Sequence, residues 1–393
     1  MESLLKKVDL LYPEMVGWRR YLHQHPELSF QEKETADFVA RHLLEWGIEV
    51  ETGVGGNGVI GRLKGSLDGP TVALRADMDA LPIQDEKDCE FASKVKGVMH
   101  ACGHDAHTST LLGVAKLMAE HRDQLRGSIV FLFQHAEEIT PGGAFSMIED
   151  GALEGVDYVY GIHLWTPLPA GTAYCKPGPM MAAADEFEIV VKGKGGHGGL
   201  PHETIDSIAI ASHLVVNLQT IVSRTVDPTQ PCVVTVGSFH SGTSFNVIAE
   251  RAHLNGTVRT FDPELRLEVK QRFETIVEQT CRMYGADFTI DYKLGYPPVV
   301  NDAGEAERFY RAAAKVGAFE TSPLIMAGED FAYYLHHRKG CFMFVGAGNP
   351  ELGIVHPHHH PKFDIDESSM AAAAKLFISM IEDCQNEWNA DKC

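Results

Sequence analysis

The sequence predicts an α/β protein with a mostly parallel sheet flanked by helices and a smaller inserted α+β domain. Three observations lead to this prediction. Strand-like and helix-like stretches alternate before residue 165 and again after residue 340, and the middle of the chain has a different order of strands and helices. Strands that alternate with helices are typical of a parallel sheet whose crossover helices cover both faces.

The outer parts of the chain carry the strands and helices of the larger domain. Short apolar runs typical of strands lie at residues 57–63, 71–76, 128–133, 157–163 and 341–346. Stretches with helical periodicity lie at residues 31–46, 105–120 and 367–385. We therefore expect residues 1–181 and 297–393 to form one discontinuous domain.

The middle of the chain, residues 182–296, has the β-α-β-β-α-β order of a ferredoxin-like domain. Its strands are predicted at residues 185–192, 232–239, 252–261 and 287–294, and its helices at residues 205–224 and 263–284. Asp262 and Pro263 form a typical helix start, with an N-cap followed by proline at the first helical position. A compact unit inserted in the larger domain is therefore expected.

Length and composition limit the classes of protein. A chain of 393 residues favours two domains, and 44% hydrophobic with 22% charged residues is an ordinary globular composition. Against 34 Lys and Arg there are 54 Asp and Glu, a formal charge of −20. Such a chain repels phosphate backbones, so nucleic acid is not an expected partner.

The apolar segments and the cysteines of the sequence predict the compartment in which the protein works. No apolar segment approaches the roughly 20 residues that cross a bilayer, and the first residues lack the apolar stretch of a signal peptide. The eight cysteines are scattered without the spacing of a disulfide framework. We therefore expect a cytoplasmic protein with reduced thiols and no membrane partner.

Five short segments carry possible metal ligands, and most follow a predicted strand. They are residues 75–82 (RADMDALP), 99–105 (MHACGHD), 134–138 (QHAEE), 161–165 (GIHLW) and 358–361 (HHHP). Loops beyond the carboxyl ends of parallel strands converge on one crevice, so these groups can share a site. A lone histidine or a pair of glutamates is more often structural or solvated. Glu137 and Glu138, however, directly follow an apolar run, where a surface pair is less expected.

Cysteine and histidine in a glycine-kinked loop, as in Cys102-Gly-His104, suit zinc, manganese, cobalt or nickel. On these residues the chain resembles the co-catalytic metallo-aminoacylase and carboxypeptidase family. Within it, the chain looks like the subfamily of hippurate hydrolases, bacterial N-acyl-amino-acid amidohydrolases and plant auxin-conjugate hydrolases. The resemblance runs from residues 18–27 (WRRYLHQHPE) to 359–363 (HHPKF), and residues 99–108 (MHACGHDAHT) and 195–197 (GGH) are its specific motifs.

Carried over by position, the resemblance implies two divalent metal ions held by Cys102, His104, Glu138, His163 and His359. Of the three consecutive histidines, His359 fits the family pattern, with His360 as the alternative. Much of the wider family has a bridging aspartate where this chain has Cys102, and a His-x-Asp pair where it has Asp77-Met-Asp79. Asp79 would then orient a ligand from outside the metal sphere, or simply cap a strand end. His135 replaces the expected proline and receives no role.

The implied reaction is hydrolysis of the amide bond of N-acyl-L-amino acids. A bound metal lowers the pKa of water from about 15.7 to about 7, which makes it a nucleophile at neutral pH. Glu137 would be the general base that takes the proton from this water and passes it to the leaving amine. Adjacent carboxylates point in different directions, so Glu138 can bind metal while Glu137 faces the water.

The inserted domain is expected to act as a lid and dimerisation domain of a homodimer or homotetramer. By resemblance His197 donates to the oxyanion, in its own site or that of the neighbouring subunit. Asn246 and Arg259 match substrate-binding positions, and Arg259 would pair with the substrate carboxylate. Outside the family context, His197 would be a turn residue and Arg259 a solvated arginine. Residues 328–331 (GEDF) match a family segment without an evident role for Glu329.

Other functions remain open at this level. The same fold could serve a small dipeptidase or carboxypeptidase, or a protein that binds acyl-amino acids without cleaving them; the retained Glu137 argues against the second. His100, His104, Asp105 and His107 superficially suggest a metallo-β-lactamase motif, but their spacing is wrong for it. A zinc nucleobase deaminase would need a Pro-Cys-x-x-Cys run, which the sequence lacks. The preferred acyl group and the native metal cannot be read from the residues.

Overall fold

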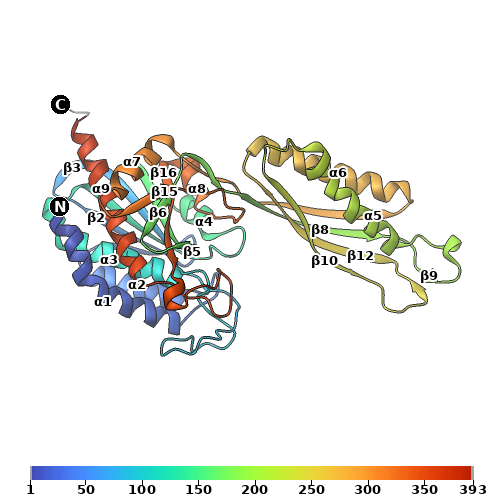
Figure 1. Cartoon of the computed structure of the whole chain (residues 1–393), viewed down its shortest axis with the longest axis horizontal. Coiled ribbons are helices and arrows are strands. Elements are labelled where there is room, and N and C mark those ends of the chain that lie inside the picture. Colours follow the sequence, from blue (N-terminus) through green and yellow to red (C-terminus); the bar gives the residue numbers. More distant parts are fainter. Residues whose placement is uncertain (1, 391–393) are drawn as a thin grey trace. The chain divides into compact units, whose positions relative to one another are not determined.

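A computed structural model describes residues 2–390 and divides into two compact units (Figure 1). The first unit runs from the N-terminal helix to Met180 and continues with Val300–Pro323 and with the chain from Asp330 onward. The second unit comprises Met181–Val299 and Leu324–Glu329. The predicted insertion, residues 182–296, differs from the second unit by a few residues at each end and lacks the short segment Leu324–Glu329.

The first unit is built on an eight-stranded sheet whose four central strands are parallel. In spatial order the strands are β1 (Glu49–Val54), β2 (Gly58–Lys64), β4 (Arg126–Gln134), β3 (Leu67–Asp77), β5 (Tyr158–Pro169), β16 (Lys339–Gly348), β6 (Thr172–Cys175) and β15 (Ala318–Thr321). The pairs β4–β3, β3–β5, β5–β16 and β6–β15 are parallel, and the other three are antiparallel. The predicted mostly parallel sheet is confirmed.

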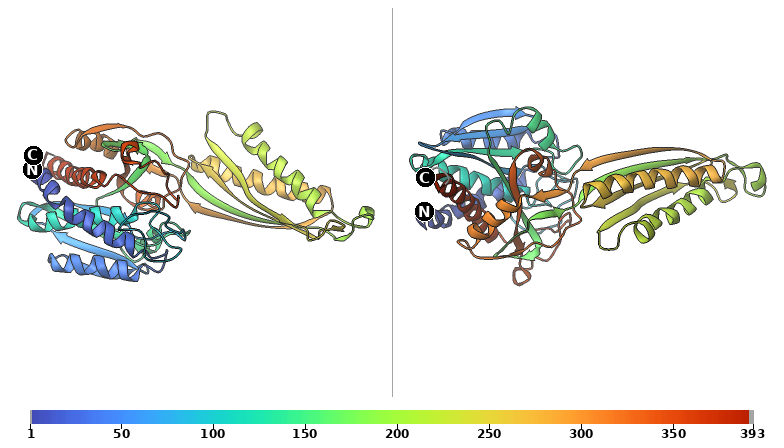
Figure 2. Two further views of the ribbon diagram at one scale, coloured as in Figure 1. Left: turned by 60° about the horizontal axis from the view of Figure 1, so that its bottom comes forward. Right: turned by 90° about the horizontal axis from the view of Figure 1, so that it is seen from above.

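Helices cover both faces of this sheet (Figure 2). They are α1 (Glu2–Gln24), α2 (Lys33–Glu45), α3 (His104–Glu120), α4 (Gly143–Glu149), α7 (Ala303–Ala313), α8 (Ala332–His337) and α9 (Ser368–Ala390). Ile129, Phe131 and Phe133 of β4 pack in the core with α1, α3 and α9. The intervening Val130 and Leu132 point to the opposite face, because successive side chains of a strand alternate. Helix α4 contacts β4 and α8 contacts β16.

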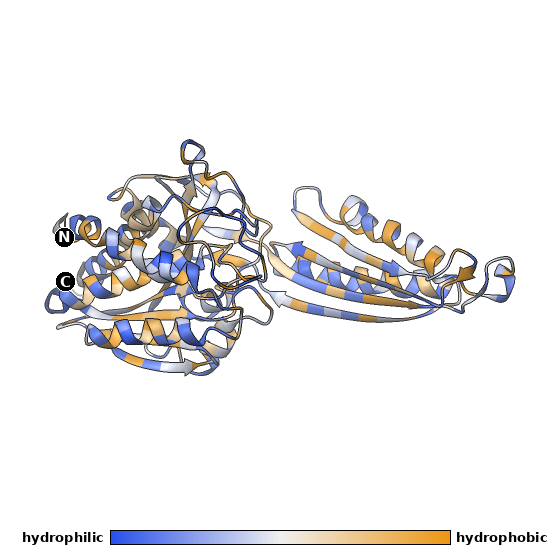
Figure 3. Ribbon diagram, turned by 90° about the horizontal axis from the view of Figure 1, so that it is seen from below, coloured by the Kyte–Doolittle hydropathy of each residue, from blue (hydrophilic) through white to orange (hydrophobic). Residues whose placement is uncertain are grey.

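The second unit is a four-stranded antiparallel sheet under two helices. Its strands, in spatial order, are β10 (Cys232–Ser241), β12 (Arg251–Thr260), β8 (Ala183–Lys192) and β13 (Asp287–Tyr296), and its helices are α5 (Ser207–Thr220) and α6 (Pro263–Met283). Hydrophobic and hydrophilic residues alternate along the strands (Figure 3), so one face packs on the helices while the other carries polar groups. A short ribbon of β9 (Gly196–His197) and β11 (Val247–Ile248) completes the unit. The chain follows the predicted β-α-β-β-α-β order.

One predicted helix is shorter than expected, and the helices α1, α4, α7 and α8 were not predicted. The helix expected at residues 205–224 begins only at Ser207, because Asp206 caps it by accepting hydrogen bonds from the backbone N–H groups of Ile208 and Ala209. It gives way after Thr220 to a turn of π-helix. The long helix α1 was not predicted at all, although Leu4, Val8, Leu11 and Met15 place an apolar stripe on one of its faces.

A short strand pair and three 3₁₀ turns complete the list of elements. They are β7 (Gly178–Met181) paired with β14 (Val299–Asn301), and the 3₁₀ turns Arg122–Gln124, Pro201–Glu203 and Pro350–Leu352. Across residues 2–390, no helix combines the length and the apolar character that a membrane span requires.

Candidate metal centre

The loops at the carboxyl ends of the central parallel strands bring the predicted ligands together. His104 begins α3, Glu137 and Glu138 follow β4, His163 lies in β5, and His359 lies in the loop after β16. The possible ligand atoms of Cys102, His104 and His163 all lie within 4.8 Å of one another. The same holds for Cys102, Glu138 and His359, and for His104, Glu137 and Glu138. All five predicted ligands and the predicted base therefore share one site, with Cys102 common to two groups.

The side chain of His163 is held with one nitrogen directed at Cys102. Its Nδ1 lies 2.9 Å from the carbonyl oxygen of Leu164, which can only accept, so Nδ1 carries the hydrogen. The unprotonated Nε2 then lies 3.4 Å from Sγ of Cys102. Burial lowers the pKa of His163 well below its usual value, which keeps the ring neutral and its lone pair available.

Asp79 holds His104 in the matching way. Nδ1 of His104 donates to the carbonyl oxygen of Asp79 at 2.9 Å and lies 3.2 Å from its carboxylate. The other carboxylate oxygen of Asp79 accepts from the hydroxyl of Ser29 at 2.7 Å and from the backbone N–H of Glu138 at 3.0 Å. Asp79 thus lies where a residue that orients one ligand and fixes the backbone of another would lie.

Glu138 and His359 close the other side of the cluster. Oε1 of Glu138 lies 3.3 Å from Nε2 of His359 and 3.9 Å from Nε2 of His104. His359 adopts a left-handed backbone conformation with φ of 63°, which is uncommon outside glycine and is often found at functional sites. Its N–H donates to the carbonyl oxygen of Ala101 at 2.8 Å, which ties this loop to the segment before Cys102.

The three consecutive histidines point to different partners. His358 stacks on Trp165 and donates to the carbonyl oxygen of Leu164, at 3.1 Å. His360 stacks on His356 with ring centroids 4.3 Å apart. Only His359 reaches Glu138, so the structure places His359, rather than the alternative His360, in the cluster.

The unpartnered atoms of the cluster fit a cation. Nε2 of His104 and Oε1 of Glu138 are buried, lie 3.9 Å apart and make no hydrogen bond, and the close polar neighbour of Oε1 at 3.3 Å is Nε2 of the proposed ligand His359. Buried polar atoms without a partner are rare, and this pair would be satisfied by an ion between them. The donor set of sulfur, imidazole nitrogen and carboxylate oxygen suits zinc, manganese, cobalt or nickel.

The charges around the cluster favour a cation as well. Burial opposes the charged form of His104, but the carboxylates of Asp77, Asp79 and Glu138 outweigh it and raise the pKa of His104 to about 10. Burial, with the nearby carboxylates, raises the pKa of the Cys102 thiol well above its usual value. The protein alone therefore does not stabilise the Cys102 thiolate, and a bound cation would have to do so.

Glu137 lies at the edge of this cluster on a tight turn. Ala136, just before it, has a φ of 52°, and its N–H donates to the carboxylate of Glu32 at 2.8 Å. The side chain of Glu137 is 7% exposed and directs a carboxylate oxygen to within 4.8 Å of the possible ligand atoms of His104 and Glu138. His135, given no role from the sequence, is fully buried and packs edge-on against Phe30.

The other histidine-rich constellation considered from the sequence is not formed as a metal site. Asp105 turns away from the cluster, because Arg19 and His23 donate to its carboxylate at 3.1 and 2.7 Å. Both ring nitrogens of His107 are engaged by Asp77 and by the backbone of Leu164. The metallo-β-lactamase alternative therefore has no structural counterpart.

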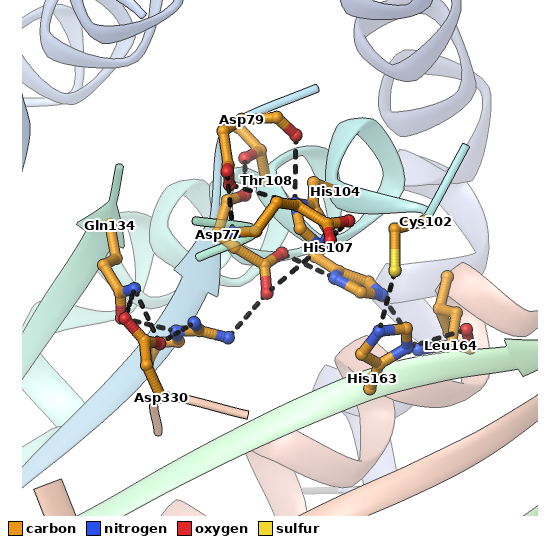
Figure 4. A network of polar contacts seen from close by, with 12 residues as sticks. Asp77, Asp79, Cys102, His104, His107, Thr108, Gln134, His163, Leu164 and Asp330 are labelled. Carbon is orange, nitrogen blue, oxygen red and sulfur yellow. Dashed lines mark hydrogen bonds and ion pairs between the residues drawn. The ribbon is translucent and has the colours of Figure 1, made fainter. Parts of the chain in front are cut away.

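Sequence reasoning missed a buried polar network behind the cluster (Figure 4). Arg75 donates to Asp77 at 2.5 Å, to Asp330 at 2.9 Å and to the side-chain oxygen of Gln134 at 2.9 Å. Asp330, which the sequence left without a role, also accepts from Gln134 and from the backbone N–H of Ala144. A charged arginine preceding Asp77 at the end of a buried strand was the available signal, because buried charges are almost always paired.

The predicted residues of the second unit lie in two separate places. His197 in β9 pairs with Val247 in β11, and the N–H of Gly198 donates to the carbonyl oxygen of Asn246 at 2.8 Å, so His197 and Asn246 are neighbours. Both side chains are exposed. Strand β9 follows the Lys192 end of β8 and lies beyond it (Figure 1).

Arg259, by contrast, pairs with Ala184, the second residue of β8. The nine residues from Ala184 to Lys192 are eight steps of about 3.3 Å and span about 25 Å, so Arg259 is remote from His197 within the chain. A Cβ added to Gly328 would lie 3.2 Å from Nη1 of Arg259 and 2.6 Å from Cβ of Ala184. Glycine at position 328 therefore lets the segment Leu324–Glu329 approach Arg259; Glu329 itself is buried.

Comparison with known proteins places this centre in a family. The chain is 51% identical over 305 residues to N-acyl-L-amino acid amidohydrolase of Geobacillus stearothermophilus, covering 77% of this chain and 82% of that protein. It is 44% identical over 375 residues to N-acetyl-L-cysteine deacetylase of Bacillus subtilis (strain 168), covering 95% and 88%.

Among solved structures, the Bacillus subtilis YXEP protein, described as a dinuclear metal binding peptidase from the M20 family, matches with a TM-score of 0.82 and 38% identity. The match covers 95% of this chain and 98% of that one. The family model for peptidase family M20/M25/M40 matches residues 73–383, a span that includes every candidate metal ligand. The chain is a member of peptidase family M20/M25/M40.

Proposed function

We propose that this protein hydrolyses the amide bond of N-acyl-L-amino acids at a centre of two divalent metal ions. The observation that carries the proposal is the pair of buried atoms without hydrogen bonds, Nε2 of His104 and Oε1 of Glu138, beside the carboxylate of Glu137. The names of two similar proteins, an N-acyl-L-amino acid amidohydrolase and an N-acetyl-L-cysteine deacetylase, support the substrate class.

The metal ions would be held by the cluster described above, namely Cys102, His104, Glu138, His163 and His359. When bound, such ions polarise a carbonyl group and acidify a water molecule. The protein's own contribution is the fixed direction of each ligand, since Asp79 aims Nε2 of His104 and Leu164 aims Nε2 of His163. The side chain of His359 is 52% exposed, whereas that of Glu138 is 8% exposed, so substrate would approach from the side of His359.

Glu137 would accept the proton of the attacking water and return it to the leaving amine. Its position supports this role, because the turn at Ala136 separates its carboxylate from that of Glu138 while keeping both beside His104. A general base so placed contributes about 10²- to 10⁴-fold to the rate.

The residues of the second unit would act in a homodimer. An N-acyl amino acid is much shorter than the about 25 Å that separate Arg259 from the ribbon of His197 and Asn246 along β8, so one chain cannot present all three to one substrate. We propose that Arg259 binds the substrate carboxylate in one chain while His197 and Asn246 of a second chain reach the reacting carbonyl group.

A reducing, cytoplasmic location fits this proposal. All seven cysteines of residues 2–390 are free thiols, and Cys102 must remain reduced to bind metal.

The test replaces Glu137 by glutamine. Glu137→Gln should keep two ions per chain, because Glu137 is not a proposed ligand, and should lower kcat for N-acetyl and N-benzoyl amino acids by about 10²- to 10⁴-fold. Metal content by mass spectrometry and initial rates measure the two effects. Glu149→Gln, at an exposed position of α4, is the matched control and should change neither.

The outcomes separate the alternatives. Unchanged turnover in Glu137→Gln would remove Glu137 as the base. A metal-loaded wild-type protein that cleaves dipeptides but no N-acyl amino acid would favour a dipeptidase or carboxypeptidase. One that binds N-acyl amino acids without cleaving them would be a binding protein.

A further inference from the structure

Three histidines converge on the backbone of one residue, Leu164 in β5. Figure 4 labels two of them, His107 and His163. The N–H of Leu164 donates to Nε2 of His107 at 2.9 Å. The carbonyl oxygen of Leu164 accepts from Nδ1 of His163 at 2.9 Å and lies 3.1 Å from Nε2 of His358. A carbonyl oxygen has two lone pairs, so it can accept both hydrogen bonds.

His107 takes the place of a missing strand partner. Strand β3 pairs with β5 only as far as Arg75 opposite Gly161, three residues before Leu164. Beyond that point, His107 is the partner of the Leu164 N–H. Without it this N–H would be a buried donor lacking a partner, which is rare and costly in folded proteins.

The partners of His107 also fix its tautomer. Nδ1 lies 2.6 Å from a carboxylate oxygen of Asp77, which can only accept, so Nδ1 carries the hydrogen and Nε2 is free to accept. Asp77 is held in turn by Arg75, at 2.5 Å, and its backbone carbonyl accepts from the hydroxyl of Thr108 at 2.7 Å. His107 and Asp77 are both buried, so their geometry is set by the protein interior.

This arrangement fixes the direction of His163. The ring of His163 donates from Nδ1 to the Leu164 carbonyl, so the orientation of that peptide determines where Nε2 points. We propose that His107 and His358 are positioning residues that hold the backbone of Leu164, His107 at its N–H and His358 at its carbonyl oxygen, and thereby aim Nε2 of His163 at the metal centre. The proposal rests on the proposed function, in which His163 is a ligand.

Two substitutions at one position test the proposal. In His107→Gln the side-chain oxygen can occupy the place of Nε2 and still accept from the Leu164 N–H, whereas in His107→Asn the shorter side chain can reach only Asp77. His107→Asn should weaken binding of one of two Co²⁺ ions by about 10- to 100-fold, and His107→Gln should retain most of the wild-type affinity.

The measurements are Co²⁺ titration by equilibrium dialysis and the visible and near-ultraviolet absorption of the Co²⁺-loaded protein. In His107→Asn we expect the lower affinity for one Co²⁺ ion to be accompanied by a change in the thiolate-to-cobalt absorption band of Cys102. The thermal unfolding temperature of the metal-free variant then shows whether the protein as a whole has been destabilised. His42→Asn is the control, because His42 lies in α2 and its ring stacks on Trp46, which follows that helix, and not on any proposed ligand.

Wild-type affinity for both ions and an unchanged spectrum in folded His107→Asn would overturn the proposal. Equal losses of Co²⁺ affinity in His107→Asn and His107→Gln would also overturn it. If His107→Asn does not fold, His358→Phe decides: it keeps a ring against Trp165 but removes the donor to Leu164, and it should weaken one ion by about tenfold. A wild-type protein that binds no Co²⁺ would instead refute the proposed function.

Discussion

The two units differ in how they hold their candidate functional residues. In the first unit, three of the five proposed ligands, Cys102, His104 and His163, are buried. In each of the two buried histidines, Nδ1 forms a hydrogen bond to a backbone carbonyl oxygen of the protein. In the second unit, His197 and Asn246 are exposed on a two-stranded ribbon, and Arg259 lies at the other end of the sheet. The difference teaches that the candidate metal centre is preorganised within one chain, whereas the proposed substrate-binding groups would need a second chain to act together.

The largest expected effect comes from mixing two inactive variants. His197→Ala alone should lose about 10²- to 10³-fold in kcat, as expected for an oxyanion donor, and Glu137→Gln at least as much. A randomly mixed dimer of the two contains one site with both residues intact, so an equal mixture should recover about a quarter of wild-type activity if sites are shared. Rates measured on heterodimers purified by two affinity tags would decide. Heterodimers with no recovered activity would show that each chain uses its own His197.

A smaller effect is expected from Arg259, whose contribution is confined to the substrate carboxylate. Loss of a charge-assisted hydrogen bond of about 1.5–3 kcal/mol predicts that Arg259→Ala raises KM for N-acyl amino acids about 10- to 100-fold. Burial lowers the pKa of Arg259, but an arginine keeps its charge at neutral pH. Steady-state kinetics on matched substrates with a carboxylate and with a neutral amide would test this. Equal effects on the two substrates would contradict carboxylate recognition.

The smallest effect concerns the loop that leads to Cys102. Although burial opposes it, hydrogen bonds from His23, Ser93 and Lys87 lower the pKa of Asp85 from 3.8 to about 2. A carboxyl whose pKa is lowered on folding stabilises the protein above pH of about 4, and this stabilisation is lost as the pH falls toward 2. Asp85→Asn should therefore lower the Tm at pH 7, and its difference from wild type should shrink below pH 4.

Thermal unfolding at pH 7, 4 and 3 measures this difference. Asp88→Asn, at an exposed position of the same loop, is the matched control and should show no such trend. If the difference in Tm between Asp85→Asn and the wild type stayed constant down to pH 3, Asp85 would not anchor the loop through its charge.

The sequence predicted the inner strands β2, β3, β4, β5 and β16, the four long strands of the second unit, and the helices α2, α3, α5, α6 and α9, because their apolar periodicity is local. The convergence of Cys102, His104, Glu138, His163 and His359 followed from the rule that parallel strands end at one edge, together with the family motifs. The motif also favoured His359 over its neighbours, and the structure places His359 beside Glu138.

What could not be predicted depends on contacts between distant segments. His107 and His358 interact with the backbone N–H and carbonyl oxygen of Leu164 in β5, and no pattern of side chains in the sequence marks a backbone N–H that lacks a strand partner. Asp330 is paired with Arg75, 255 positions away in the chain. The separation of Arg259 from His197 also required the register of β8 and β12, which the sequence does not contain.

The central claim is that two cations share one set of ligands drawn from four strand ends. The most direct test is anomalous diffraction from crystals of the protein loaded with Zn²⁺ or Mn²⁺, collected at the absorption edge of the metal. We predict two anomalous peaks among the side chains of Cys102, His104, Glu138, His163 and His359, with Glu137 adjacent. Peaks elsewhere on the chain, with these side chains left uncoordinated, would contradict the account.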